Sequence, residues 1–170
     1  MATPNPAAVA NLADVHAVPV FDAAIAPLLT GAQAGGNLSA FHVTADPLSG
    51  PPLHRHANED ETIYVLAGTV GFVCDGRRWT SGPGTLAYLP KGSAHTWANL
   101  TERHARLLVV CQPGGFEGYL LEAAKRGLDP NADADALAEL GTRYGLELLG
   151  SNPLLKPVAM KAQAPIQLAV

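Results

Sequence analysis

The sequence predicts an all-β barrel or sandwich followed by two helices. Short segments rich in β-branched and aromatic residues recur between residues 37 and 112, and each is bounded by Gly, Pro, Asn or Asp. The 17 glycines and 14 prolines of this 170-residue chain favour many short elements joined by tight turns. Strands at this spacing, with turn residues between them, are typical of all-β sandwiches and barrels.

The predicted strands follow one another closely. Asp75 and Gly76 give a strong hairpin signal, and the proline-rich segment 46–52 is predicted to be a loop. The strands are expected at residues 37–44, 62–66, 69–74, 77–80, 85–89, 95–99 and 105–111.

The pattern changes after Pro113-Gly114-Gly115. Apolar residues from Phe116 to Ala124 recur at helical spacing, and Gly127 suits the end of that helix. A second helix is expected at residues 133–144. We therefore divide the chain into an N-terminal arm (1–36), a single barrel core (37–112), and a C-terminal part with two helices and an extended tail (113–170).

Charge and hydropathy exclude several function classes. The formal net charge is −4 and the longest basic run is Arg77-Arg78, which argues against nucleic acid as a partner. No apolar stretch approaches the roughly 18 residues of a membrane span, and residues 1–14 do not resemble a signal peptide. We therefore expect a cytoplasmic protein with Cys74 and Cys111 as free thiols in the core.

Two histidines and a carboxylate lie close together in the barrel core. His54 and His56 are two residues apart, so on a strand both imidazoles point to the same face. Glu61 follows five residues later, and two imidazoles beside a carboxylate are a common ligand set for a metal with open positions. The neighbouring carboxylates Glu59 and Asp60 are interpreted as solvated loop charges.

Around these residues the chain resembles the cupin superfamily. The first cupin motif is Gly, five residues, His-x-His, four residues, Glu, six residues, Gly, and three residues rather than five follow the first glycine here. The second is Gly, five residues, Pro-x-Gly, two residues, His, three residues, Asn, and the chain fits every position. The matching residues are Gly50, His54, His56, Glu61 and Gly68, then Gly84, Pro90, Gly92, His95 and Asn99.

The resemblance implies a double-stranded β-helix, or jelly roll, that holds one divalent metal ion. His95 would be the third imidazole, and Fe, Mn, Ni, Co, Cu or Zn would suit three nitrogens and one oxygen. Trp97 is expected on the inward face with His95, and Ile63 and Val65 share the parity of Glu61. We expect these three side chains to line a pocket for a small organic substrate.

A narrower resemblance covers residues 54–150. The segments 54–66, 113–117 and 144–147 look like those of bacterial single-domain relatives of quercetin 2,3-dioxygenase. This resemblance implies a dioxygenase that acts on a flavonol-like or other enolisable aromatic compound, with Glu61 as both ligand and general base. The alternatives are a cupin isomerase, lyase or polyketide cyclase, which would not use dioxygen, and a non-catalytic small-molecule-binding cupin.

The assembly is expected to be a homodimer. Open jelly-roll sheets leave strand edges that proteins usually pair or cover. The N-terminal segment or the tail would cover such an edge.

Overall fold

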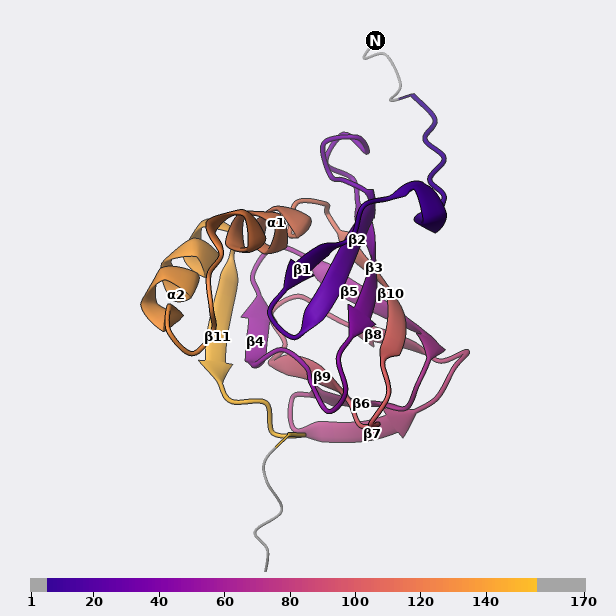
Figure 1. The fold of residues 1–170 in the computed structure, drawn as a ribbon. Helices are drawn as coiled ribbons and strands as arrows, with labels where there is room; N and C mark the ends of the chain where they lie inside the picture. The colour runs from indigo at the N-terminus through magenta and orange to yellow at the C-terminus, as the bar shows by residue number, and fades with distance from the viewer. Residues whose placement is uncertain (1–5, 156–170) are drawn as a thin grey trace, which may run out of the picture.

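The chain folds into two antiparallel β-sheets that pack face to face, with two helices at one side (Figure 1). The computed structural model describes residues 6–155. The larger sheet has the strand order β1 (Val18–Val20), β2 (Ala23–Leu29), β3 (Ser39–Ala45), β10 (Ala105–Gln112), β5 (Asp60–Ala67), β8 (Leu86–Leu89). The smaller sheet has the order β11 (Leu146–Gly150), β4 (Leu53–His56), β9 (His95–Asn99), β6 (Val70–Cys74), β7 (Arg77–Ser81). This architecture is consistent with the expected double-stranded β-helix.

The core lies between the two sheets. Alternate residues of the larger sheet, such as Val65 on β5 and Leu107 on β10, point inward and are completely buried. Phe72 on β6 faces them from the smaller sheet and belongs to the same hydrophobic cluster. Each such side chain contributes about 1.5–3 kcal/mol when it leaves water, so this shared cluster holds the sheets together.

The helices follow the barrel as the sequence predicts. α1 spans Glu117–Arg126, and Gly127 ends it in the left-handed conformation at φ 63°. α2 spans Ala134–Arg143 and packs against β11, while η1 (Leu12–Asp14) is a single turn near the N-terminus. No helix within residues 6–155 is long and apolar enough to cross a membrane.

The division of the chain at residue 37 needs correction. Residues 1–36 were expected to form an arm, but β1 and β2 are part of the larger sheet, where Ile25 pairs with Val43 of β3. Pro27 lies inside β2, beside a register shift in its pairing with β3. A proline inside a short segment argues against a strand unless a bulge or a sheet edge accommodates it. The sequence analysis therefore did not predict β2.

The C-terminal part also contributes a strand. β11 pairs with β4, and Arg55 and Glu147 form an ion pair of 2.8 Å across this pairing. The sequence analysis expected no strand here because a five-residue apolar segment directly after a helix carries little periodicity. The expected extended tail falls mostly on residues 156–170, outside the described residues.

Asn99, the last residue of the second motif, joins two loops. Its side chain is completely buried. Its Nδ2 donates hydrogen bonds to the carbonyls of Asp46 (2.8 Å) and Arg103 (2.7 Å). Its Oδ1 accepts from the backbone N–H and the hydroxyl of Thr101, at 3.0 and 2.8 Å. Asn99 therefore ties the end of β9 to the loop after β3 and to the turn before β10.

Replacing Asn99 should destabilise the barrel. In Asn99→Ala the carbonyls of Asp46 and Arg103 keep the hydroxyl donors of Ser49 and Thr101. The backbone N–H of Thr101 loses its acceptor and three further hydrogen bonds are lost, so the free energy of unfolding should fall by about 1–3 kcal/mol. Denaturant unfolding measures this change. Asn37→Ala, at an exposed position, is the control and should change stability by less than about 0.5 kcal/mol. Equal stability of the two variants would contradict this role of Asn99.

Candidate metal centre

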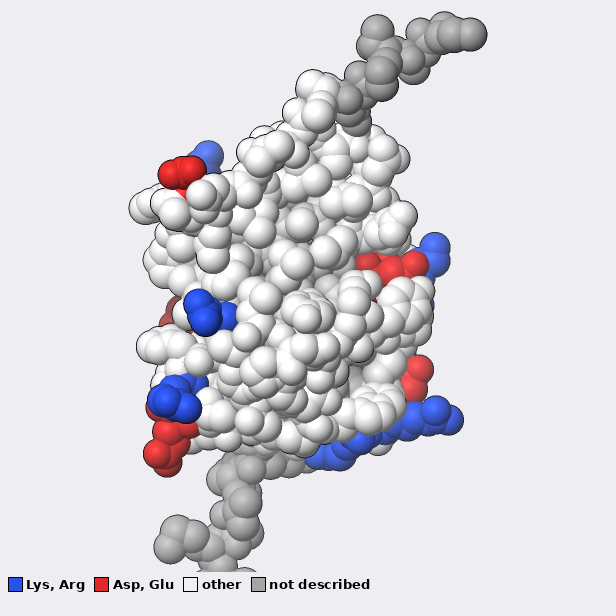
Figure 2. Space-filling model, turned by 90° about the vertical axis from the view of Figure 1, so that its right-hand side faces the viewer, with Lys and Arg blue, Asp and Glu red and all other residues white. Residues whose placement is uncertain are grey.

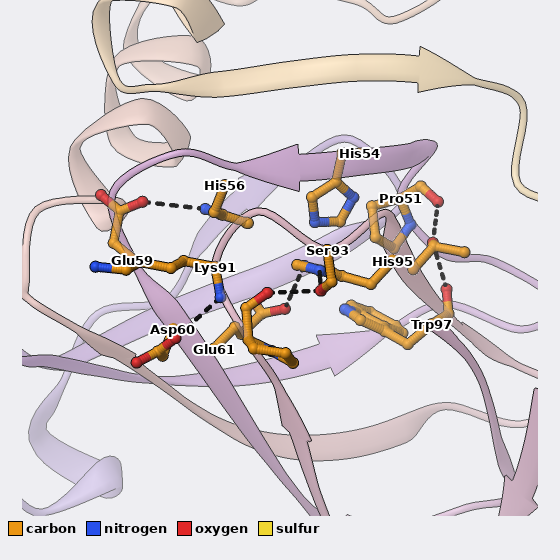
Figure 3. A network of polar contacts seen from close by, with 12 residues as sticks. Pro51, His54, His56, Glu59, Asp60, Glu61, Lys91, Ser93, His95 and Trp97 are labelled. Atoms are coloured by element: carbon orange, nitrogen blue, oxygen red, sulfur yellow. Dashed lines mark hydrogen bonds and ion pairs between the residues drawn. The ribbon is translucent and has the colours of Figure 1, made fainter. Parts of the chain in front are cut away.

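Four potential metal ligands converge inside the barrel from three strands (Figure 3). His54 and His56 lie on β4, Glu61 lies on β5, and His95 lies on β9, where it pairs with His54 across the strands. All four side chains are buried, and one donor atom from each lies within 4.8 Å of the others. The structure thus brings together the four residues that the two motifs singled out.

Hydrogen bonds orient two of the imidazole rings. Nδ1 of His54 lies 2.8 Å from the carbonyl of Pro52, which can only accept. The Ser93 hydroxyl donates to the carbonyl of Pro90 at 2.6 Å, so its oxygen accepts from Nδ1 of His95 at 3.2 Å. Both histidines therefore carry their proton on Nδ1, which leaves the Nε2 lone pair free for a metal ion.

Glu59 orients the third imidazole, and the expectation that it is a solvated loop charge is wrong. Its side chain is buried, and Oε2 lies 3.3 Å from Nδ1 of His56. Asp60 is half-buried and accepts the backbone N–H of Lys91 at 2.9 Å. The turn between β4 and β5 folds Glu59 back onto His56. The only sequence signal for this contact was its position between the two ligands.

The donor set fits a divalent cation. Nε2 of His56, Nε2 of His95 and Oε2 of Glu61 are buried and have no hydrogen-bond partner among the described residues. Nε2 of His95 and Oε2 of Glu61 are 3.5 Å apart. Two ligands about 2.1 Å from one ion and about 100–110° apart are separated by about 3.2–3.4 Å. Atoms that both carry lone pairs are stable at this distance when a cation lies between them.

The surroundings hold two of the four ligands, His54 and Glu61, in the protonation states that bind metal. Burial, together with the nearby His95, lowers the pKa of His54 to about 3, so its imidazole is neutral at neutral pH. Burial opposes ionisation of Glu61, but the contact with His95 and the proximity of the other two imidazoles lower its pKa to about 2. Neutral imidazoles and a carboxylate are the forms that coordinate metal ions.

A cavity of about 600 Å³ opens onto this centre. His54, Glu61 and Trp97 contribute to its wall, and apolar side chains from both sheets and from α1 form most of the rest. Among the described residues, no Lys or Arg lines it, and the other acidic side chains in the wall are Asp22 and Asp129. The main apolar wall residues are Val20, Ile25, Phe41, Val43, Val109, Phe116, Tyr119 and Leu120.

Of the three expected pocket residues, one lines the cavity and two lie in the core. Trp97 lies in the cavity wall. Ile63 and Val65 face the barrel interior, as their parity with Glu61 predicts, but they are completely buried in the core and do not line this cavity. Strand parity fixes the face that a side chain takes and does not fix whether other core residues cover it.

Helix α1 supplies aromatic wall residues, of which the sequence analysis predicted only the helical spacing. Phe116, at its N-cap, meets the ring of His56 edge-on with the ring centres 4.3 Å apart. Tyr119 stacks on Phe116, and burial raises the pKa of its hydroxyl to about 12. At neutral pH this phenol stays protonated, so it can donate a hydrogen bond within the cavity.

The chain should bind one divalent ion at this centre. In the double variant His54→Ala with His95→Ala, two of the four ligands are lost, and metal content measured by elemental analysis should fall from one ion per chain to near zero. The control removes two histidines elsewhere, the exposed His16 and His104, and should keep full occupancy. Full metal content in the first variant would show that the ion binds at another position.

Glu59→Gln should weaken metal binding while the four ligands remain. Loss of the carboxylate beside Nδ1 of His56 reduces the basicity of that ligand, and such outer partners typically contribute about 10–100-fold in metal affinity. A competition titration with Co²⁺ and a chelator measures the dissociation constant. Asp60→Asn is the matched control, because it removes a charge one residue away that contacts the Lys91 backbone. Equal affinity of both variants would contradict this role.

Comparison with known proteins places the barrel in a family. Residues 41–111 match the family model described as a cupin domain. A curated relative, the oxidoreductase iacF of Pestalotiopsis fici, is 28% identical over 100 residues, which cover 49% of this chain and 49% of that protein. The chain therefore matches about half the length of that relative.

Two solved structures illustrate the similarity of fold. KdgF from Halomonas sp. has a TM-score of 0.60 and 17% identity, covering 66% of this chain and 99% of that one. The polyketide cyclase RemF from Streptomyces resistomycificus has a TM-score of 0.52 and 27% identity, covering 60% of this chain and 76% of that one. With both motifs in place around the four converging ligands, residues 41–111 form a cupin domain.

Proposed function

We propose that this protein is a metal-dependent dioxygenase that acts on a neutral, enolisable aromatic compound of the flavonol type. The observation that carries the proposal is the mostly apolar cavity wall beside the candidate metal centre, which has no Lys or Arg among the described residues. The volume of the cavity, about 600 Å³, is in the range of pockets that enclose a small organic molecule of several rings.

The charge of the wall restricts the substrate class. Enzymes that bind phosphates or carboxylates hold them with Arg or Lys side chains. Among the described residues, this wall offers neither, and it carries Asp22 and Asp129 instead. For a sugar phosphate or a small dicarboxylate, only a bound metal ion would offset the negative charge of the substrate. The wall therefore favours a neutral substrate.

Glu61 is positioned to act as the general base. Its carboxylate is ionised, its side chain reaches the cavity wall, and Oε2 has no hydrogen-bond partner among the described residues. A divalent ion at the centre supplies a Lewis acid that stabilises the negative charge left on the substrate. A carboxylate with a low pKa is a weak base, so Glu61 needs a substrate hydroxyl that is itself acidic, as enols are.

Aromatic side chains can hold a flat substrate against this base. Trp97 on β9 and Phe116 at the start of α1 both line the cavity that contains Glu61. Flat rings bind well between such surfaces because they bury a large area and stack in offset or edge-on arrangements. Tyr119, as a neutral phenol, can donate a hydrogen bond to a substrate carbonyl and so set the orientation.

Support for redox chemistry comes from the curated relative, which is named as an oxidoreductase. A second candidate function, favoured by the 27% identity to the polyketide cyclase RemF, is a cyclase that uses the same base and the same neutral pocket. The two candidates differ in one measurable respect, because a dioxygenase consumes dioxygen and a cyclase does not.

Glu61→Gln should lower turnover far more than metal content. The amide cannot accept a proton at neutral pH, and a general base typically contributes about 10²–10⁴-fold in rate. The three imidazoles remain to hold the ion, so the variant is compared with the unchanged protein at equal metal loading. Oxygen uptake with a panel of flavonols and other enolisable aromatics, each with and without air, measures the activity.

The outcomes of this experiment separate the candidates. Substrate-dependent oxygen uptake supports the dioxygenase, whereas equal product formation under nitrogen identifies the cyclase or isomerase alternative. Near-normal turnover of Glu61→Gln would exclude Glu61 as the base. Ligand binding without turnover of any compound under either gas would indicate a binding protein.

A further inference from the structure

A row of aromatic side chains leads from the metal centre toward the surface. The ring centre of Phe116 lies 4.3 Å from that of the ligand His56, and Tyr119 stacks nearly parallel on Phe116 at 5.7 Å. Phe21 continues the row, with its ring centre 6.5 Å from that of Tyr119. His56 is completely buried, whereas Phe21 is 38% exposed, so the row runs outward.

The three outer rings of this row line the cavity that also contains His54 and Glu61. A cavity of about 150 Å³ is enough for a single benzene ring, and this one has about 600 Å³. A one-ring substrate at Glu61 would leave most of this space unfilled and forgo the dispersion contacts of the outer wall. A substrate with several rings in line would fill the cavity and reach its outer end.

Phe21 holds an unfavourable backbone conformation. It lies in the two-residue turn between β1 and β2, with φ at 54°, a left-handed region that is rare for bulky side chains. The next residue fixes the turn, because the carbonyl of Asp22 accepts from the Asp46 N–H at 3.0 Å and the Ser49 hydroxyl at 3.2 Å. Backbone strain held in place by its surroundings is typical of functional positions, and here it places the ring in the cavity wall.

We propose that Phe21 selects substrates with several aromatic rings in line, because it contacts the ring that lies farthest from the metal centre. The inference rests on the proposed function, in which the enolisable end of the substrate lies at Glu61. The remaining rings then extend along Phe116 and Tyr119, and the last ring packs against Phe21. Flat rings gain from such contacts through burial and through offset or edge-on stacking. A one-ring enol at Glu61 does not reach Phe21.

The binding of a long and a short compound to the Zn²⁺-loaded full chain under nitrogen tests the proposal. 3-Hydroxyflavone and 3-hydroxypyran-4-one share the same enolisable end, and only the flavone carries further rings. Calorimetry measures both dissociation constants, and the unchanged protein should bind the flavone at least about 10-fold more tightly. In Phe21→Asn the constant for the flavone should rise by roughly 10-fold, whereas that for the pyranone should change by less than about 2-fold.

Controls separate the lost ring from other effects of the substitution. Asn tolerates the left-handed conformation, so Phe21→Asn should unfold within about 3 °C of the unchanged protein. Leu48→Asn is the matched backbone control, because Leu48 has a φ of 52° and lies outside the cavity wall. It should bind 3-hydroxyflavone as the unchanged protein does.

A second control addresses adsorption of the apolar flavone to the outside of the molecule. Figure 2 shows a broad area without charged side chains on the side where the larger sheet lies in Figure 1. Tyr64 on β5 of this sheet is 38% exposed, as Phe21 is, and lies outside the cavity wall. Tyr64→Asn should therefore leave the affinity for 3-hydroxyflavone unchanged.

The outcomes distinguish the role of Phe21 from the proposed function. An equal effect of Phe21→Asn on both compounds, or no preference of the unchanged protein for the flavone, would overturn the role of Phe21 even if flavonols support oxygen uptake. A selective loss of affinity for the flavone without oxygen uptake would support this role and count against the dioxygenase. Phe21→Tyr keeps the ring and should keep the affinity within about 2-fold. Phe21→Gly, for which a positive φ has no steric cost, replaces Phe21→Asn if that variant does not fold.

Discussion

Three imidazoles and a carboxylate are buried together, and Nε2 of His56, Nε2 of His95 and Oε2 of Glu61 have no hydrogen-bond partner within residues 6–155. Much of the structure depends on this constraint. A buried polar atom without a partner costs about 1–3 kcal/mol, so the cluster destabilises the empty barrel and gains stability from a cation. Strands β4 and β9 pair only at His54 and His95, which is a weak connection for two ligand-bearing strands. β11 therefore supports β4 from its other edge. The Asn152 side chain also donates to the carbonyl of Pro51 in the segment before β4 (2.8 Å) and to that of Trp97 on β9 (2.9 Å).

The orientation of the ligands also depends on groups outside the ligand set. The Pro52 carbonyl, the Ser93 hydroxyl and the Glu59 carboxylate each engage the Nδ1 atom of one histidine. The Pro-x-Gly turn contributes as well, because the Gly92 N–H donates to the carbonyl of His56 at 2.8 Å. Gly50 allows the loop before β4 to approach β9, since a Cβ there would lie 2.3 Å from the carbonyl oxygen of Trp97. The two motifs thus specify both the ligands and the backbone that orients them.

The sequence predicted what is local and missed what depends on tertiary contacts. The resemblance to the two linked motifs identified His54, His56, Glu61 and His95, because each motif spans only two successive strands and the turn between them. Helical periodicity located α1 and α2, whose apolar faces repeat over several turns. The sequence analysis missed β2 because a proline lies inside it, beside a register shift. It missed β11 because a five-residue segment is too short to show a periodic pattern. Glu59 was misjudged because the turn that folds it onto His56 is not visible in spacing, and burial depth removed Ile63 and Val65 from the cavity wall.

The distribution of the ligands over the two sheets links the metal site to the rest of the fold. The three histidines belong to the smaller sheet, whereas Glu61 belongs to β5 of the larger sheet. An ion held by all four would therefore cross-link the sheets at the mouth of the cavity. Strand β5 is held in the larger sheet by β10 on one side and β8 on the other, so these pairings fix the position of Glu61. Metal affinity should then depend on how the two sheets pack, because the four ligands converge only while β5 keeps a fixed position relative to the smaller sheet.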